Sequence, residues 1–114
     1  MDTSFGMSLQ TGIPQTNRSG DIDPFLIFHM VQAEGMPLEE VQQQMQTNGG
    51  LLGISGVSND FREVAAAAAD GNERAALALK ILPTAIKKII GGYIAEMNGR
   101  DVLVFTAGIG ENQS

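Results

Sequence analysis

Val102-Leu103-Val104-Phe105-Thr106 leads through Ala107 into Gly108-Ile109-Gly110-Glu111-Asn112, and this stretch says most about the fold. The apolar run predicts a buried strand over 101–106, and the glycines predict a tight loop after it. In α/β proteins, a buried strand that leads into a glycine loop brings backbone N–H groups to a phosphate. The stretch therefore predicts an α/β protein that binds a nucleotide.

Helices are predicted for much of the sequence before this strand. Asp23-Pro24 combines a capping residue with a proline at the first helical position, so a helix is expected over 24–34. Pro37 begins a second helix, which ends at 48–50. A third helix, over 62–69, begins after the capping pair Asn59-Asp60.

A longer helix is predicted from Glu73, where apolar residues recur at helical spacing for about seven turns until Asn98-Gly99. Pro83 is expected to kink it, because proline removes one backbone hydrogen bond and crowds the preceding turn. Residues 51–58 alternate apolar side chains with glycines and are read as a packed connector.

A single strand cannot form a sheet by itself. Its backbone groups would stay unpaired, and only residues 2–10 offer a possible neighbour within this sequence. The sequence therefore predicts either an incomplete domain or a chain that completes its sheet by pairing with another copy.

Composition excludes several classes of protein. The chain has 114 residues, 43% of them hydrophobic, and a net charge of −6, which argues against binding to a nucleic-acid backbone. It has no cysteine, so disulfides and thiolate metal sites are excluded. No apolar run approaches the roughly 20 residues of a membrane span, and the first residues do not form a signal peptide. A cytoplasmic location is expected, without a membrane or nucleic-acid partner.

Five blocks of the sequence, in their order and spacing, resemble the second half of the acetate kinase family. They are Asp2-Thr3-Ser4-Phe5-Gly6-Met7, Asn17-Arg18-Ser19-Gly20-Asp21-Ile22-Asp23-Pro24, Gly50-Leu51-Leu52-Gly53-Ile54-Ser55-Gly56, Asp60-Phe61-Arg62 and Phe105-Thr106-Ala107-Gly108-Ile109-Gly110-Glu111-Asn112. The resemblance covers essentially the whole chain. It implies an α/β fold, a partial ribonuclease H-like domain of the actin and sugar-kinase type, mostly helical with few strands. Residues 1–114 would then be an incomplete segment of the C-terminal half of such an enzyme.

The resemblance also implies a reaction, in which ATP phosphorylates acetate to give acetyl phosphate and ADP with the help of Mg²⁺. Arg18 matches the arginine that stabilises the transition state, since its guanidinium can bond a carboxylate or a phosphoryl oxygen in a forked geometry. From the residues alone, Arg18 could instead pair with Asp21 or Asp23 inside a loop.

Two segments match nucleotide-contacting parts of the family. The first is Asp60, Phe61 and Arg62, implied to lie near the adenosine; read alone, Asp60 is a helix cap and Arg62 a solvated residue of the first turn. The second consists of Gly108, Ile109, Gly110, Glu111 and Asn112, where small residues let the backbone approach the phosphates. Read alone, that loop could be an ordinary strand-to-helix turn.

No metal site is predicted in this chain, although Mg²⁺ serves the family. His29, the only histidine, has no cysteine or carboxylate at ligand spacing and is read as a packing or surface residue. Capping and helix-dipole roles account for the acidic residues Asp21, Asp23, Glu39 and Glu40. The family's metal ligands, catalytic aspartate and second essential arginine have no match here, so the chain alone is expected to be inactive.

The match leaves three matters open. Asn17, Pro83 and Gln113 depart from the family's usual pattern, which affects packing detail and neither Arg18 nor the glycine loop. Acetate and propionate are both possible substrates of the parent enzyme. The chain could alternatively be a non-catalytic module that binds nucleotide weakly or oligomerises through exposed edges, and a homo-oligomer is expected.

Overall fold

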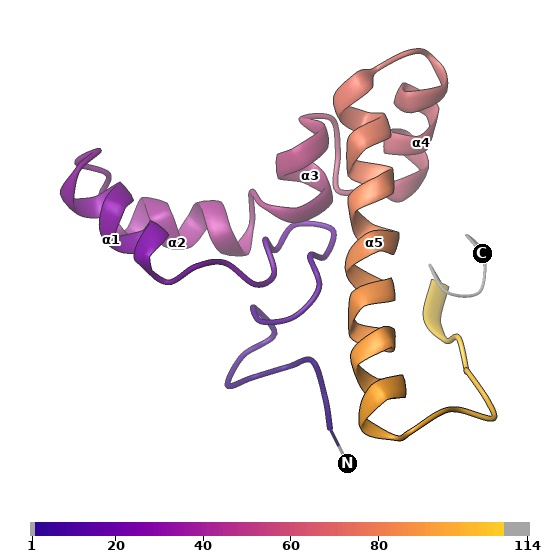
Figure 1. Ribbon diagram of the computed structural model, residues 1–114. Coiled ribbons are helices and arrows are strands. Elements are labelled where there is room, and N and C mark those ends of the chain that lie inside the picture. Colours follow the sequence, from indigo (N-terminus) through magenta and orange to yellow (C-terminus); the bar gives the residue numbers. More distant parts are fainter. Residues whose placement is uncertain (1, 109–114) are drawn as a thin grey trace.

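The computed structural model describes residues 2–108 as five helices joined by loops (Figure 1). The helices are α1 (Phe25–Gln32), α2 (Leu38–Gln46), α3 (Gly50–Ser55), α4 (Phe61–Ala69) and α5 (Glu73–Glu96). Residues 2–24 form a long irregular segment before α1. Four of these helices lie where the sequence predicts them, and α3 was not predicted.

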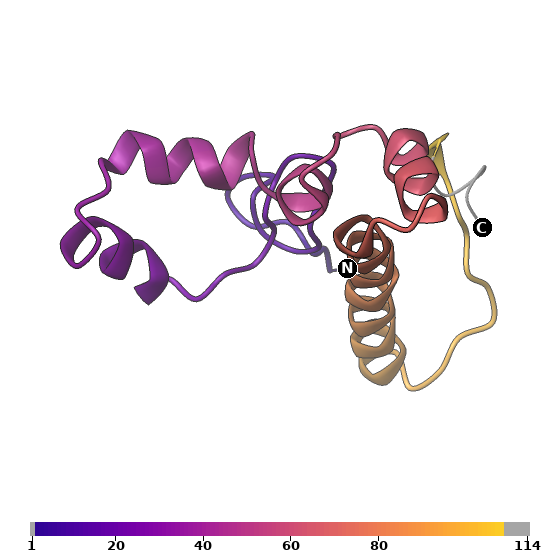
Figure 2. The same cartoon turned by 90° about the horizontal axis from the view of Figure 1, so that it is seen from above.

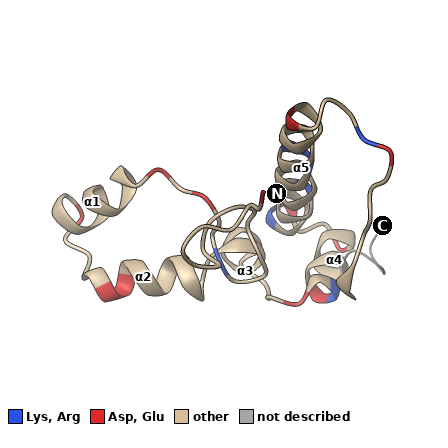
Figure 3. Ribbon diagram, turned by 90° about the horizontal axis from the view of Figure 1, so that it is seen from below, with Lys and Arg blue, Asp and Glu red and all other residues tan. Residues whose placement is uncertain are grey.

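The helices form two groups. α3 and α4 both pack against α5, whereas α1 packs against α2 (Figure 1). Seen from above, α1 and α2 extend away from the other helices as an arm, with the N-terminal loops beside α3 (Figure 2). The acidic first turn of α2, Glu39 and Glu40, lies in this arm (Figure 3).

A small apolar core joins α3, α4 and α5. Its buried members are Leu51, Val64, Ala75 and Ala78, with Ile54, Phe61, Ala67, Ala68 and Leu79 packed against them. Alanine side chains on facing surfaces allow the α4 and α5 backbones to approach closely. The alanine run of α4 therefore contributes to packing as well as to helix propensity.

The helix starts are stabilised by the side chains that the sequence suggests. Asp60 accepts a hydrogen bond from the N–H of Arg62 at the start of α4, and Asn72 accepts one from the N–H of Ala75 at the start of α5. Asp23 accepts from the N–H of Phe25 at 3.0 Å, but α1 begins at Phe25 with Pro24 as its N-cap, one residue later than predicted.

The interpretation of 51–58 as a connector was wrong for 51–55, because Gly50–Ser55 is helix α3, and it holds for 56–58. Glycine propensity argues against a helix here, but tertiary hydrogen bonds outweigh it. The N–H groups of Leu51 and Leu52, which have no partner within the helix, donate to the carbonyls of Gln15 and Thr16 at 2.9 Å each. Residues far along the sequence thus hold this short helix.

The prediction of a strand over 101–106 was also wrong for this chain, since no strand occurs within residues 2–108. Residues 102–106 have no regular secondary structure and expose their apolar side chains, with Val102 at 76% and Leu103 at 42%. A strand needs a neighbour to satisfy its backbone groups, and no segment between residues 2 and 100 pairs with it. The described chain is therefore all-helical.

The long helix continues without interruption through Pro83. Figures 1 and 2 show no sharp bend where the sequence predicts a kink. The hydroxyl of Thr84 donates to the carbonyl of Lys80 at 2.7 Å next to the proline.

Within the described residues, no helix is both long and apolar enough to cross a bilayer.

A groove lies along α5. Its walls are the loop at 13–16, one face of α5 and the segment 103–106, and its volume is about 520 Å³. Leu51, Leu82, Ile86 and Ile90 are among the apolar side chains that line it. We call this surface the α5 groove.

Candidate functional site: the Arg18 loop

The loop that carries Arg18 is fixed between the end of α2 and the start of α3. Ser19 N–H donates to the carbonyl of Met45 at 2.9 Å, and Gly49 N–H donates to the carbonyl of Asn17 at 3.0 Å. The bonds from α3 to Gln15 and Thr16 hold the other side of the loop. Backbone contacts on both sides of Arg18 therefore set the direction of its side chain.

Glycine is required where α3 meets this loop. Gly50 has a φ of +58°, and a Cβ built on it would lie 2.1 Å from the Gln15 carbonyl oxygen and 2.5 Å from that of Arg18. No side chain fits this space, and the backbone conformation itself favours glycine. Gly20 has a φ of +75°, and a Cβ built on it would lie 2.6 Å from the Pro14 nitrogen and 2.7 Å from the Gly12 carbonyl oxygen. These contacts explain the glycines in the two sequence blocks around Arg18.

The Arg18 side chain has no acidic partner among residues 2–108. Its Nη1 donates to the Gln15 side-chain oxygen at 3.3 Å, and the residue is half-buried. It lines a pocket of about 300 Å³ together with Ser8, Leu9, Gln10, Asn17, Gln46 and Thr47. Most of the guanidinium donors thus remain available for an anion.

The alternative pairing of Arg18 with Asp21 or Asp23 does not occur in the structure. Asp21 accepts a hydrogen bond from the N–H of Gly12 at 2.7 Å, and Asp23 accepts from the N–H of Phe25. Both carboxylates are used to shape the backbone. Arg18 is therefore left as a cation without a neutralising carboxylate within the described residues.

Gln10 was not singled out from the sequence, but it braces the loop from the N-terminal segment. Its Nε2 donates to Ser19 Oγ at 2.7 Å and to the Gly20 carbonyl at 3.3 Å. Its Oε1 is buried and has no hydrogen-bond partner within the described residues. This oxygen can only accept a hydrogen bond, so it offers nothing to an anion, and Arg18 is the charged residue among those that line the pocket.

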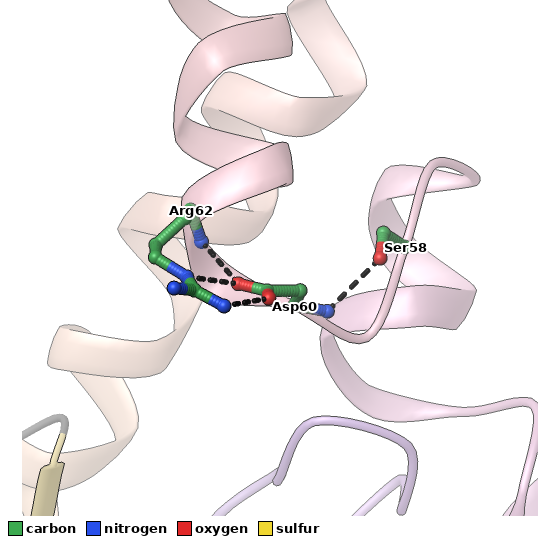
Figure 4. A network of polar contacts seen from close by, with 3 residues as sticks. All are labelled: Ser58, Asp60 and Arg62. Carbon is green, nitrogen blue, oxygen red and sulfur yellow. Dashed lines mark hydrogen bonds and ion pairs between the residues drawn. The ribbon is translucent and has the colours of Figure 1, made fainter.

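The Asp60 to Arg62 segment forms a compact ion pair at the start of α4 (Figure 4). Asp60 Oδ2 lies 2.6 Å from Arg62 Nη2, and Asp60 Oδ1 accepts from Arg62 Nε at 3.1 Å. The hydrogen bonds from the Arg62 side chain and N–H lower the pKa of Asp60 to about 2. The carboxylate in turn raises the pKa of Arg62.

This arrangement agrees with the reading of Asp60 as a helix cap, and Ser58 Oγ accepts from the Asp60 N–H at 3.0 Å (Figure 4). Arg62 remains 82% exposed, so its outer face is accessible. Phe61 packs against the apolar core. An adenosine contact by Phe61 would have to use the part of the ring that the core leaves exposed.

Of the predicted glycine loop, only Gly108 belongs to the described residues; Ile109, Gly110, Glu111 and Asn112 lie outside them. Gly108 is exposed, and a Cβ built on it would meet no atom within 4 Å. Ala107 before it has a φ of +64°, which is unusual for a residue with a side chain.

The structure brings some of the predicted residues together and not others. Asp60 and Arg62 contact each other, but no hydrogen bond or ion pair of the described residues joins them to Arg18. His29 lies 3.3 Å from Glu34, and both side chains are well exposed, so His29 is a surface residue as one of its two readings has it. Within residues 2–108, no three metal-binding side chains gather.

Arg74 is the second site-related residue that the sequence interpretation missed. Its guanidinium donates to the carbonyls of Gly53 and Ile54 at the end of α3. One signal was available: a cation in the first turn of a helix is unfavourable for the helix dipole, which suggests a partner elsewhere.

Arg18 thus combines free donors, a fixed loop and a polar pocket, which are the features of a candidate anion site. Comparison with known proteins shows the family to which the chain belongs. A model of the acetokinase family matches residues 1–114. The chain is 48% identical over 112 residues to the acetate kinase of Geobacillus sp. (strain WCH70), which covers 98% of the chain and 28% of that protein. The chain belongs to the acetokinase family.

Solved structures agree. The crystal structure of Porphyromonas gingivalis acetate kinase matches with a TM-score of 0.91 and 45% identity, over 96% of this chain and 28% of that one. A propionate kinase from Francisella tularensis subsp. tularensis SCHU S4 matches with a TM-score of 0.91 and 39% identity, over 98% of this chain and 29% of that one. The chain therefore spans less than a third of the length of these relatives.

Proposed function

We propose that this chain is a segment of an ATP-dependent carboxylate kinase, which transfers a phosphoryl group from ATP to a short-chain carboxylate such as acetate. In this proposal Arg18 stabilises the charge that develops on the transferred phosphoryl group. Asp60, Phe61, Arg62 and the loop 108–112 contact the nucleotide. The segment belongs to a ribonuclease H-like domain in the C-terminal half of the enzyme.

One observation carries the proposal: Arg18 lies half-buried in a polar pocket without a carboxylate partner among the described residues. Arg62, by contrast, is paired with the carboxylate of Asp60. An arginine kept free at a cost in desolvation has a use for an external anion. The family supplies the identity of that anion, a phosphoryl group or a carboxylate.

Propionate is an alternative acceptor. Both acetate and propionate kinases are among the similar proteins, at nearly the same identity and the same TM-score. The pocket residues within 2–108 give no basis for distinguishing acetate from the longer propionate.

The anion site can be tested by NMR titration of the chain with acetyl phosphate, followed at the side-chain N–H of Arg18. We expect a saturable shift in the wild type and none in Arg18→Ala. Lys80→Ala is the control, because it removes an exposed cation that lies outside both the pocket and the proposed nucleotide-contacting segments. Equal shifts in the wild type and in Arg18→Ala would contradict the proposal.

Nucleotide binding is tested separately, by calorimetric titration with magnesium-ADP. We expect weak binding in the wild type, which Gly110→Val abolishes. The chain alone is expected to show no turnover, since phosphoryl transfer needs Mg²⁺ and positioning groups from several directions. Turnover by pure protein that disappears in Arg18→Ala would overturn that expectation.

A second candidate function is self-association through the α5 groove. The groove is apolar, and the adjoining segment 102–106 exposes the apolar side chains of Val102, Val104 and Phe105. Apolar patches of this kind mark interaction surfaces. A second copy of the chain could cover the groove and offer a pairing partner to 102–106.

A further inference from the structure

Arg74 connects the start of α5 to the end of α3. Its Nη2 donates to the Gly53 carbonyl at 2.9 Å and its Nε to the Ile54 carbonyl at 3.0 Å. These carbonyls belong to the last turn of α3, where no intrahelical N–H is available to them. A forked, charge-assisted contact is geometrically specific, so Arg74 fixes the position of this helix end.

Gly56 makes room for the guanidinium. It has a φ of +68° and ends α3 by donating its N–H to the Leu52 carbonyl at 2.8 Å. A Cβ on Gly56 would lie 3.0 Å from Arg74 Nη1 and 3.2 Å from Arg74 Cζ. The turn after α3 is therefore shaped to accept this arginine.

The opposite end of α3 holds the Arg18 loop. Gln15, whose carbonyl accepts from Leu51, also bonds Arg18 twice: its N–H donates to the Arg18 carbonyl at 3.0 Å, and its side-chain oxygen accepts from Arg18 Nη1 at 3.3 Å. α3 has only six residues, a length of about 9 Å. A short rigid element thus separates the two arginines.

The partners of Arg74 distinguish it from a surface arginine. Arg62 pairs with a carboxylate two residues away, while Arg74 bonds backbone carbonyls 20 and 21 positions earlier in the chain. Near the N-terminus of α5 its charge is unfavourable to the helix dipole. The contact with α3 offsets that cost and gives the residue a role outside its own helix.

We propose that Arg74 is a positioning residue for Arg18. By holding the end of α3 it fixes the start of that helix, and with it the Gln15 contacts that orient the Arg18 guanidinium toward the pocket. The ligand of Arg18 rests on the proposed function, but the mechanical link between the two arginines does not.

Hydrogen exchange of Arg74→Gln tests the link directly, with Lys80→Gln as a control that removes one positive charge from an exposed residue of the same helix. We expect the amides of Leu51 and Leu52 to exchange about tenfold faster or more in Arg74→Gln, while those of Val64 and Ala78 keep their wild-type rates. Unchanged rates at Leu51 and Leu52 would overturn the proposal. So would an equal acceleration at all four amides, which indicates a general loss of stability.

If Arg74→Gln does not fold, Arg74→Lys serves instead, because lysine keeps the charge but loses the fork. It should accelerate exchange at Leu51 and Leu52 by a smaller factor, again with Val64 and Ala78 unchanged. Wild-type rates at Leu51 and Leu52 in Arg74→Lys would show that the forked contact has no role.

A titration with inorganic phosphate gives the second readout, followed at the Arg18 side-chain N–H. Arg74→Gln should weaken phosphate binding severalfold, and Lys80→Gln should not. Wild-type affinity in Arg74→Gln would overturn the proposal. If the wild type itself binds no phosphate, the proposed function fails, and the exchange rates at Leu51 and Leu52 alone decide whether Arg74 holds the loop.

Discussion

At the scale of single residues, the Arg18 loop shows how glycines can hold a charged side chain in place. Gly50 and Gly20 have no side chain, and each lies where the Cβ of another residue would clash with backbone atoms. The loop is fixed by this close approach and by backbone hydrogen bonds. Arg18 can consequently stay partly exposed without relying on a salt bridge for its orientation.

Gly50→Ala should destabilise the chain by about 2–4 kcal/mol, since it adds a Cβ at a positive φ and against the Gln15 carbonyl. Gly91→Ala is the control, because this glycine of α5 has open space around it and lies inside a helix. It should stabilise the chain by about 0.5–1 kcal/mol. Urea unfolding measures both, and equal effects would contradict the packing described here.

Asp60 should make stability depend on acidity. Its pKa is lowered to about 2 in the folded chain, so the carboxylate stabilises the folded state above its ordinary pKa of 3.8. That contribution is lost as the pH falls from about 4 to about 2. We expect the urea midpoints of wild type and Asp60→Asn to differ most above pH 5 and to converge near pH 2, because asparagine still caps. A constant difference would show that the ion pair with Arg62 has no effect.

At the scale of elements, sequence patterns succeeded where local chemistry decides and failed where distant contacts decide. The starts of α4 and α5 follow from capping residues that act within a few positions, namely Asp60 and Asn72. α3 forms because Gln15 and Thr16 accept its first N–H groups, and no local pattern contains that information. The prediction for 102–106 fails in the opposite way, because the segment has strand-forming residues but pairs with no other segment of residues 2–108.

The residues of the candidate site also divide into those that local sequence reveals and those that only the folded structure reveals. Arg18 and Asp60 to Arg62 were singled out through the family resemblance, because each lies in a short block of consecutive residues that can be recognised in one sequence. Gln10 and Arg74 were missed, since each acts on residues that lie nearby only after folding. A lone glutamine or arginine in a sequence gives little indication of such a contact.

Pro83 lies inside α5 without a sharp bend in the helix. Replacing it should therefore restore the stability that the helix loses with the missing backbone hydrogen bond. Pro83→Ala restores a backbone N–H that can reach the Leu79 carbonyl and should raise stability by about 2–3 kcal/mol. Pro37→Ala, just before α2, should change it by less than about 1 kcal/mol. Thermal and urea unfolding measure the two variants. A loss of stability in Pro83→Ala would mean that packing around α5 depends on the proline.

At the scale of the whole molecule, the chain is more open than a compact protein of its size. Its radius of gyration is 15.8 Å, against roughly 13 Å for a compact domain of this length. The accessible surface is 8082 Å², and a compact monomer of 12.1 kDa would expose roughly 6,000 Å². The difference, about 2,000 Å² per chain, is in the range that obligate interfaces bury.

Self-association through the α5 groove should therefore be measurable by light scattering coupled to gel filtration. We expect the wild type to elute as a dimer or larger species and Ile90→Lys to be monomeric, because a charge in the groove is costly to bury. Leu77→Lys is the control, since Leu77 is an exposed residue of α5 outside the groove lining. A monomeric wild type at high micromolar concentration would contradict self-association.

The arm formed by α1 and α2 has a consequence for how the chain opens. No residue of α1 is fully buried, whereas the body of the molecule shares one core. Within the arm, α1 should therefore open more easily than α2, so limited proteolysis should cut first between residues 25 and 36. The Met45 contact that holds Ser19 lies beyond this region. A clipped chain should consequently keep the Arg18 loop in place, as two associated peptides.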